Sequence, residues 1–303
     1  MIKTSKTVVF FGSGPVAAKS LELLSLDFEI EAVITKPSTL SEMSAITDAP
    51  TYSVSSRKEL DEFFASAKFR SQVAVLIDFG IIVSQAVIDY FSKGIVNSHF
   101  SLLPQWRGAD PITFAILSGQ KQTGVSLMLL VEAMDEGPVF SQGVYDIKSH
   151  ETSTTLTDYL IKLSHALLKH DLPRYLNGEL KPTSQERVAK ALNIPPEPTY
   201  SRKLTKADGI IGWDKSAEQI EREIRAFTEW PKSRTSINGL DVVITSSKVV
   251  KKQIEPCGKF WVENKQLFVS CGKDSLEILT LKPAGKRDMT AQAFLAGYGN
   301  RIV

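Results

Sequence analysis

The segment Thr7-Val8-Val9-Phe10-Phe11-Gly12-Ser13-Gly14-Pro15 is the clearest indication of the fold class. Its first five residues form a continuous uncharged run, which is typical of a strand buried on both faces of a parallel sheet. The two glycines that follow allow the tight turn between a strand and a helix. A helix is expected next, because Ala17, Ala18, Leu21 and Leu24 lie on one helical face. This order of strand, turn and helix predicts an α/β fold.

The chain up to residue 176 continues to alternate between strand and helix patterns. Apolar runs predict further strands at 30–34, 73–77, 95–96 and 123–131. Helix patterns follow at 84–93, 110–119 and 151–176. Strands that alternate with helices in this way predict a doubly wound, mostly parallel sheet.

A change of composition marks a domain boundary. Pro195-Pro196-Glu197-Pro198 is stiff and extended, so we expect a first domain at 1–190, a linker at 191–204 and a second domain at 205–303. The second domain has one helix pattern at 216–227, followed by short alternating segments separated by Gly, Asn and Lys. That spacing predicts a smaller antiparallel β-barrel of the oligonucleotide-binding (OB-like) type.

The composition of the 303 residues excludes several classes of protein. A hydrophobic content of 43% with 23% charged residues is ordinary for a globular chain and too apolar for a largely disordered one. Cys257 and Cys271 lack Cys-x-x-Cys spacing, so they predict neither a thiolate zinc site nor a disulfide framework. No stretch has the roughly 18 apolar residues of a membrane span, and no export signal is evident. We therefore expect a cytoplasmic protein.

The last third of the chain is modestly basic. The whole chain carries a formal charge of +2, but residues 201–303 contain 18 Lys and Arg against 12 Asp and Glu. This excess favours a phosphate-bearing partner, although solvated surface lysines would give the same count. The residues expected to contact an RNA backbone are Lys203, Lys206, Lys232, Arg234, Lys248, Lys251 and Lys252.

The pattern Gly12-x-Gly14-x-x-Ala17 is similar to a dinucleotide-binding turn. Such a turn is normally followed, about 20 residues later, by an acidic residue that binds the ribose. Here the second strand ends in Val33-Ile34-Thr35-Lys36 instead. A nicotinamide-dependent dehydrogenase is therefore the least favoured interpretation.

The segment 97–104 is a stronger indication of function. It follows a predicted parallel strand, at the edge where open α/β sheets bind ligands. Asn97 and His99 alternate, so in extended backbone they project to the same side. Asp135 follows the strand at 123–131 and could orient His99, provided that this strand runs parallel to the others. With no activated Ser or Cys between them, these residues suit direct attack of an amine on a carbonyl carbon.

These residues belong to a longer signature that resembles the folate-dependent formyltransferase family. Its parts are Asn97-x-His99, Ser101-Leu102-Leu103-Pro104, Trp106-Arg107-Gly108-Ala109 and a Met-Asp-x-Gly turn around Asp135. Two later segments, Thr199-Tyr200-Ser201-Arg202-Lys203-Leu204 and Leu281-Lys282-Pro283-Ala284-Gly285-Lys286, resemble the branch that acts on methionyl-tRNA. The resemblance covers nearly the whole chain and excludes mainly residues 37–72.

The resemblance implies a Rossmann-like formyltransferase domain and a specific reaction. The formyl group of 10-formyltetrahydrofolate, a cosubstrate used without a metal, would move to the α-amine of methionine on initiator tRNA. Asn97 and His99 would hold the formyl oxygen, and Asp135 would set the ionisation of His99. The implied folate site comprises Ser101, Leu102, Leu103, Pro104, Phe79, Gly80, Ile81 and Ile82, with the loop at 134–138. We expect a monomer that does not contact membranes.

One segment departs from the family's pattern. Family members usually carry, after the second strand, a long loop rich in Arg, Lys and Gly that touches the tRNA acceptor end. Residues 38–50 here contain no Arg or Lys, but they do contain Glu42 and Asp48. Either the basic C-terminal domain binds the tRNA acceptor, or the acceptor is instead a sugar-nucleotide amine or another small amine. A catalytically dead RNA-binding protein is a further alternative, which the intact Asn97, His99 and Asp135 disfavour.

Overall fold

The chain folds into two compact units. The structure is a computed structural model that describes residues 6–252, 254 and 256–299. The first unit runs up to Pro111 and also includes Gln122–Asp146 and Thr157–Arg202. The second unit contains Ile112–Lys121, Ile147–Leu156 and the residues from Lys203 onward.

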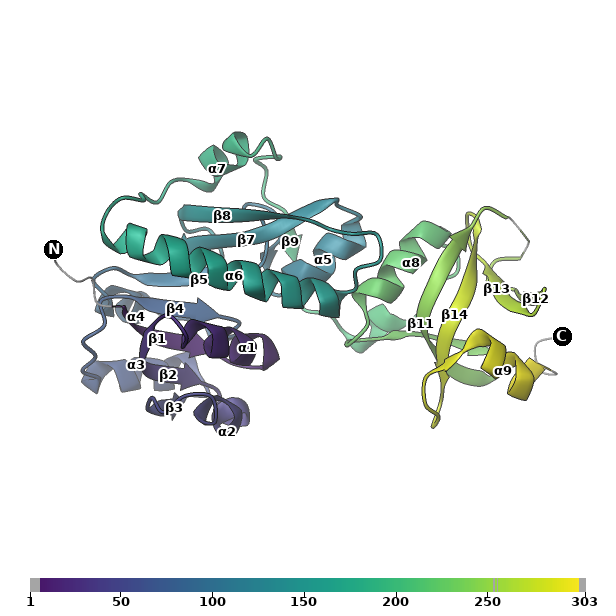
Figure 1. The fold of residues 1–303 in the computed structure, drawn as a ribbon, viewed down its shortest axis with the longest axis horizontal. Coiled ribbons are helices and arrows are strands. Elements are labelled where there is room, and N and C mark those ends of the chain that lie inside the picture. The colour runs from purple at the N-terminus through teal and green to yellow at the C-terminus, as the bar shows by residue number, and fades with distance from the viewer. Residues whose placement is uncertain (1–5, 253, 255, 300–303) are drawn as a thin grey trace. The chain divides into compact units, whose positions relative to one another are not determined.

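A seven-stranded sheet forms the centre of the first unit (Figure 1). Its strands lie in the order β3-β2-β1-β4-β5-β7-β8. Their bounds are β1 (Thr7–Gly12), β2 (Glu29–Thr35), β3 (Thr51–Ser53), β4 (Ala74–Ile77), β5 (Ile95–His99), β7 (Gln122–Leu129) and β8 (Val139–Asp146). The strands from β3 to β5 pair in parallel, whereas β7 and β8 pair antiparallel. The prediction of a doubly wound, mostly parallel sheet is confirmed.

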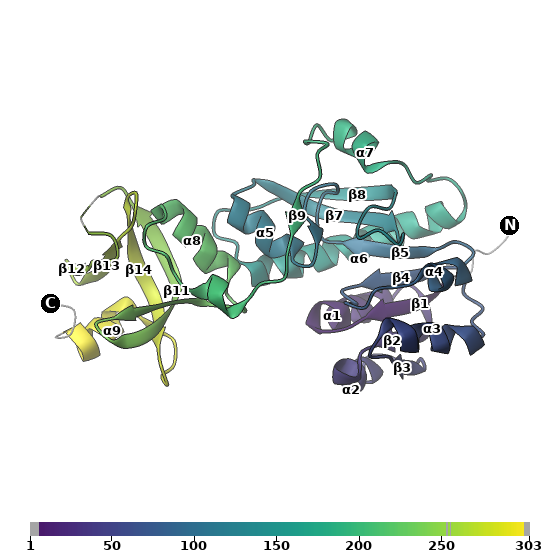
Figure 2. The same ribbon diagram turned by 180° about the vertical axis from the view of Figure 1, so that it is seen from behind.

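Helices cover both faces of this sheet (Figures 1 and 2). On one face lie α1 (Pro15–Leu24) and α6 (Ser153–Leu176), joined by the ion pair Lys19–Asp158 at 2.7 Å. On the other lie α3 (Arg57–Ser66) and α4 (Gln85–Tyr90), whose apolar side chains share a core cluster with Val9 and Phe11 of β1. All six residues of β1 are buried, as a strand between two helical layers requires.

Local signals fix the ends of α4. The Ser84 hydroxyl accepts a hydrogen bond from the Val87 backbone N–H at 3.3 Å, so it caps the helix as its sequence predicts. The helix ends at Tyr90, earlier than the expected Lys93, because Phe91 takes an extended conformation and packs against Phe11 and Phe64. Gly94, at φ +75°, then turns the chain into β5.

The segment 37–72, which the sequence patterns did not resolve, forms short elements at the β2 end of the sheet. They are η1 (Pro37–Thr39), α2 (Leu40–Ser44), β3 and α3. Met43 of α2 is fully buried, and β3 extends the sheet by pairing in parallel with β2. The segment at 38–50, which contains no Arg or Lys, is therefore anchored to the first unit through Met43.

The second unit is built on antiparallel strands that share a core with helices. Its sheet has the order β10-β11-β14-β13-β12, with β15 paired to β14. The strands are β10 (Ser233–Ile237), β11 (Leu240–Val250), β12 (Phe260–Glu263), β13 (Gln266–Ser270), β14 (Ser275–Pro283) and β15 (Met289–Thr290). The helices are η2 (Lys206–Gly209), α8 (Ala217–Ala226), α9 (Ala291–Tyr298) and most of α5 (Pro111–Ser118). The antiparallel pairing expected from the short alternating segments is present.

Two further properties concern the whole described chain. Within residues 6–252, 254 and 256–299, no helix is long and apolar enough to cross a membrane. Cys271 is buried in the second unit, and burial raises the pKa of its thiol to about 12. This thiol therefore stays protonated and unreactive at neutral pH.

Candidate active site

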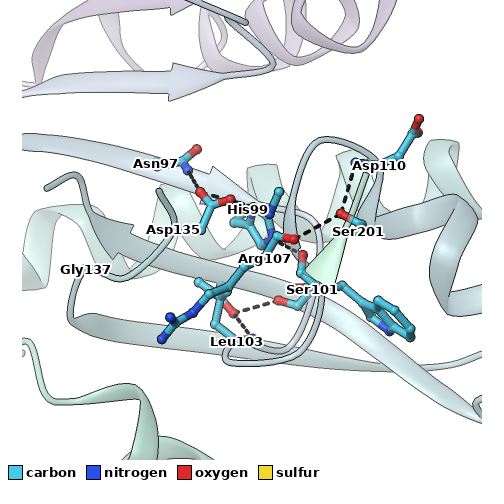
Figure 3. Close-up of polar contacts among 12 residues, drawn as sticks. Asn97, His99, Ser101, Leu103, Arg107, Asp110, Asp135, Gly137 and Ser201 are labelled. Atoms are coloured by element: carbon cyan, nitrogen blue, oxygen red, sulfur yellow. Dashed lines mark hydrogen bonds and ion pairs between the residues drawn. The ribbon is translucent and has the colours of Figure 1, made fainter. Parts of the chain in front are cut away.

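Asn97 and His99 lie at the carboxyl-terminal half of β5 and reach the same oxygen atom (Figure 3). The Asn97 side chain donates from Nδ2 to Oδ1 of Asp135 at 3.3 Å. Nδ1 of His99 lies 3.7 Å from that same Oδ1. All three residues are less than a tenth exposed. The structure thus brings together the three residues that the sequence singled out.

The route by which Asp135 reaches β5 differs from the expected one. The sequence placed Asp135 at this site on the condition that β7 runs parallel to β5, and this condition is wrong because β7 is antiparallel. Its last residue, Leu129, pairs with Val96 near the start of β5. The loop that follows turns back along β5, and only this reversal carries Asp135 to Asn97 and His99.

The short strand β6 (Arg107–Gly108) and the residue before it hold both His99 and Asp135. Nε2 of His99 lies 2.9 Å from the Trp106 carbonyl oxygen. A carbonyl oxygen only accepts, so Nε2 carries the hydrogen, and the Nδ1 of neutral His99 is left as an acceptor facing Asp135. The Gly108 backbone N–H donates to Oδ2 of Asp135 at 2.7 Å. Asp135 therefore has one oxygen held by the backbone and the other directed at the two β5 side chains.

Glycine is required at position 108 because two backbones meet there. β6 pairs in parallel with β9 (Tyr200–Ser201), and a Cβ on Gly108 would lie 2.4 Å from the Ser201 carbonyl oxygen. Gly108 also has φ +107°, a backbone conformation that residues with a Cβ atom rarely adopt. The Ser201 hydroxyl donates to the Arg107 carbonyl at 3.2 Å and accepts from the Asp110 N–H at 3.2 Å. The pairing with β9 thus fixes the backbone that binds Asp135.

The segment 101–104 supports the site from inside the core. The side chains of Ser101, Leu102 and Leu103 are buried, as is Pro104. The Ser126 hydroxyl accepts from the Leu103 N–H at 3.0 Å and donates to the Ser101 carbonyl at 2.6 Å. The segment is therefore buried as a whole and supports the site from beneath.

The segment 79–82 divides between core and surface. Phe79 is 1% exposed and packs edge-on against Phe11, so its ring belongs to the core. Gly80 is exposed at φ +68°, and Ile82 is 60% exposed. Ile81 is partly buried against the core cluster. Of the four residues of this segment that are expected to contact folate, Gly80 and Ile82 are exposed enough to do so.

A group of charged side chains borders Gly80. A Cβ on Gly80 would lie 2.6 Å from the Nζ of Lys36, so the lysine extends over this glycine. Asp78 precedes the segment, and burial raises the pKa of its carboxyl, with Lys36 acting to lower it and Asp110 to raise it. The sequence patterns gave no indication of Asp78, because Lys36, Asp78 and Asp110 are far apart in the chain and come near each other only in the fold.

The basic residues of the second unit are partly neutralised. Lys251 pairs with Glu218 and Asp274, each at 3.1 Å, and Lys252 pairs with Glu263 at 2.5 Å. Lys206, Lys232 and Lys248 are exposed. The positive charge available to a phosphate backbone is therefore smaller than the sequence count indicates.

Family models match most of the chain. Residues 8–172 match the model described as formyl transferase, and residues 203–299 match the one described as formyl transferase, C-terminal domain. The chain belongs to the formyltransferase family. The family predicted from the motifs around Asn97, His99 and Asp135 is confirmed, and the protein is a transferase.

Curated relatives of this formyltransferase are similar over nearly its full length. A methionyl-tRNA formyltransferase of Magnetococcus marinus is 32% identical over 309 residues, covering 98% of this chain and 96% of that protein. A methionyl-tRNA formyltransferase of Pseudoalteromonas translucida is 31% identical and covers 96% of this chain and 93% of that protein.

A solved structure shares the formyltransferase fold at lower identity. The N-formyltransferase of Helicobacter canadensis, solved with folinic acid and dTDP-3-aminofucose, has a TM-score of 0.66 and 20% identity. The superposition covers 90% of this chain and 98% of the Helicobacter canadensis chain. The likeness supports the architecture described above.

Proposed function

We propose that this protein transfers the formyl group of 10-formyltetrahydrofolate to the α-amine of methionine on initiator tRNA. The observation that carries the proposal is the convergence of Asn97 and His99 on one oxygen of Asp135. The proposed acceptor follows the curated relatives, which are methionyl-tRNA formyltransferases of nearly the same length.

The proposed chemistry needs no covalent enzyme intermediate. The amine nitrogen attacks the formyl carbon, the new C–N bond forms, and the bond from that carbon to the folate nitrogen breaks. Negative charge develops on the formyl oxygen during the attack, and preorganised N–H donors stabilise such charge. The nitrogen that attacks loses a proton, and the folate nitrogen that leaves gains one.

The residues of the site fit these demands. Asn97 Nδ2 has two hydrogens, and since one is directed at Asp135, the other is available to the formyl oxygen. Because Nε2 of His99 donates to Trp106, Nδ1 is left to accept the amine's proton, and we assign His99 this role in place of the expected hold on the formyl oxygen. Asp135 would stabilise the imidazolium that forms, in the way a carboxylate supports an acid–base histidine.

The folate cosubstrate would lie against the surface of Gly80 and Ile82 and the loop at 134–138. Met134 in that loop is 67% exposed and offers an apolar contact for a ring system. Ser101, Leu102, Leu103 and Pro104 would back this site through their buried backbone, whereas Phe79 would act only by shaping the core beneath Gly80.

The acceptor would be bound mainly by the second unit, through exposed lysines such as Lys232 and Lys248. The segment 38–50 supplies no Arg or Lys. The salt dependence of tRNA binding should therefore be shallower than that of an enzyme with a basic loop, because fewer counterions are released. We propose that the enzyme acts as a monomer in the cytoplasm.

A small amine, such as a sugar-nucleotide amine, is the second candidate acceptor. Two observations favour it: the folded segment at 37–53 without basic residues, and the ion pairs that neutralise Lys251 and Lys252. The length of the methionyl-tRNA formyltransferase relatives, matched through the C-terminal domain, favours the tRNA.

The deciding experiment measures formyl transfer from 10-formyltetrahydrofolate to methionyl-initiator tRNA. Elongator methionyl-tRNA and an amino-sugar nucleotide serve as parallel acceptors, and His99→Ala serves as the inactive control. Transfer confined to the initiator tRNA and lost in the variant supports the proposal. Transfer only to the amino-sugar nucleotide would show that the acceptor is a small amine and not the tRNA. Folate binding without transfer to any of these compounds would exclude both candidate acceptors.

A further inference from the structure

Gln185, the first residue of α7 (Gln185–Ala191), contacts the loop that carries Asp135. Its Nε2 donates to the backbone carbonyls of Asp135 at 2.7 Å and of Gly137 at 2.9 Å. Its Oε1 accepts from Nε and Nη2 of Arg107 at 3.2 and 2.9 Å. The side chain is buried, and both of its amide hydrogens and its oxygen are used. A side chain so completely paired has a single orientation.

Arg107 also contacts this loop, both directly and through Gln185. While Nε and Nη2 hold Gln185, Nη1 pairs with the Glu136 carboxylate at 2.9 Å. Its neighbour Gly108 donates to the Asp135 carboxylate. Three consecutive loop residues, 135 to 137, are therefore bound by side chains or backbone of Gln185 and of β6.

The loop needs these bonds, because its own conformation is unfavourable. Asp135 has φ +52°, in the left-handed region that non-glycine residues seldom occupy. Gly137 is packed so closely that a Cβ there would lie 1.8 Å from the Leu129 carbonyl oxygen. Such a conformation persists only where the surroundings impose it. The two bonds from Gln185 are made to the backbone carbonyls of these two residues.

We propose that Gln185 is a positioning residue for formyl transfer, which holds the Asp135 carboxylate between Asn97 and His99 by binding the carbonyls of residues 135 and 137. The inference rests on the proposed function, because it assigns Asp135 its role there. Gln185 has no contact with Asn97 or His99 among its hydrogen bonds and acts through the loop alone.

This role differs from simple anchoring of α7. Anchoring would change the free energy of unfolding without changing catalysis in the folded enzyme. Positioning predicts a loss in kcat, because displacement of a reacting group by about 1 Å costs on the order of 10²-fold. It predicts little change in the KM for the acceptor, because none of the hydrogen bonds of Gln185 involves the exposed lysines. The KM for folate does not separate the two roles, because Gln185 binds the loop at 134–138, which forms part of the proposed folate surface.

Two variants separate these roles. Gln185→Ala removes all four hydrogen bonds, and kcat should fall by about tenfold to 10²-fold. Gln185→Glu keeps the acceptor for Arg107 but places a carboxylate oxygen against two carbonyls. Its kcat relative to the wild type should recover in part as the pH falls, because the protonated carboxyl can again donate to one of them. A purely structural contact gives no such pH-dependent recovery.

The neighbouring Glu186→Gln is the matched control. Glu186 is exposed on the same helix and, within the described part of the chain, forms its ion pair with Lys190, so its variant should keep wild-type kcat. Amide hydrogen exchange of the loop at 130–138, read by mass spectrometry, gives a second measurement that requires no acceptor. Exchange should accelerate in Gln185→Ala and stay unchanged in Glu186→Gln.

The outcomes are distinct. A lower kcat, an unchanged KM for the acceptor and faster loop exchange support the inference. An unchanged kcat in Gln185→Ala, or a change confined to KM, overturns it. If the wild type fails to formylate methionyl-tRNA, the proposed acceptor is wrong, but loop exchange still decides whether Gln185 holds Asp135: unchanged exchange overturns the inference on its own.

Discussion

The backbone N–H of Gly108 and the carboxylate of Asp135 are joined by a 2.7 Å hydrogen bond across 27 residues of sequence. This bond determines which oxygen of Asp135 faces the site. Because Oδ2 is occupied by Gly108, only Oδ1 remains to meet Asn97 and His99. Both side chains therefore face a single oxygen of Asp135. The proposed chemistry depends on the negative charge of this carboxylate, which would stabilise protonated His99.

Asp135→Asn tests that charge without changing the size of the side chain. An amide cannot stabilise a protonated His99 as a carboxylate does, so kcat should fall by about 10²- to 10⁴-fold. Folate binding, measured by fluorescence titration, should stay within about twofold, because Asp135 is nine-tenths buried and the amide has the same size as the carboxylate that it replaces. A kcat within tenfold of the wild type would remove Asp135 from the mechanism.

Asn97→Ala tests the donor to the formyl oxygen. Loss of one preorganised donor should lower kcat by about 10²- to 10³-fold, roughly 3 kcal/mol of transition-state stabilisation. Steady-state kinetics with initiator methionyl-tRNA measure the effect. Asn177→Ala, an exposed asparagine after α6, is the control and should leave kcat unchanged. Equal kinetics in the two variants would argue against an oxyanion role.

The ion pairs of the second unit predict which lysines bind RNA. Lys232→Ala should weaken tRNA binding and reduce the slope of log affinity against log salt by about 1, as loss of one phosphate contact does. Lys251→Ala should leave that slope nearly unchanged, because Lys251 is already paired with Glu218 and Asp274. Binding measured between low and moderate salt distinguishes them, and equal slopes for both variants would contradict the assignment.

Asp171 of α6 gives a prediction for stability against pH. Burial opposes its ionisation, but hydrogen bonds from Ser141, His170 and Arg174 outweigh this and lower the pKa of its carboxyl. The ionised form is therefore favoured in the folded state. Its stabilisation is complete above the ordinary value of 3.8 and is lost as the pH falls through the lower folded value.

Asp171→Asn should accordingly lower the free energy of unfolding at pH 7 by about 1.5 to 3 kcal/mol, the usual contribution of hydrogen bonds to a charged group. The difference from the wild type should narrow below pH 3.8. Asp158→Asn on the same helix breaks only an exposed pair with Lys19 and should cost less than about 1 kcal/mol. Denaturant titrations at several pH values check both, and a difference that does not vary with pH would refute the linkage.

Two glycines should respond in opposite ways to alanine. Gly137→Ala forces a Cβ against the Leu129 carbonyl and should destabilise the protein by about 2 kcal/mol or more while lowering kcat. Gly297→Ala places a methyl group in open space near the end of α9 and should stabilise it by about 0.4 to 1 kcal/mol without affecting kcat. Thermal unfolding and kinetics measure both effects. A neutral Gly137→Ala would mean that the loop adjusts freely.

Features that depend on neighbouring residues could be predicted from the sequence. The apolar run at 7–11 and the glycines after it specify β1 and its turn, because burial on both faces demands a run without charge. Alternation along β5 is enough to project Asn97 and His99 to one side. The cap at Ser84 likewise follows from one hydroxyl and the next three residues.

Tertiary structure alone decided the features that depend on residues far apart in the chain. The antiparallel direction of β7 cannot be read from its apolar pattern, because burial of both faces gives the same run in either direction. Gln185 reaches Asp135 across 50 residues, and a lone glutamine at a helix start gives no signal of that contact. The burial of Phe79 and the ion pairs of Lys251 with two carboxylates also depend on residues far apart in the chain. Packing, which the local pattern does not encode, chooses the partner of each side chain.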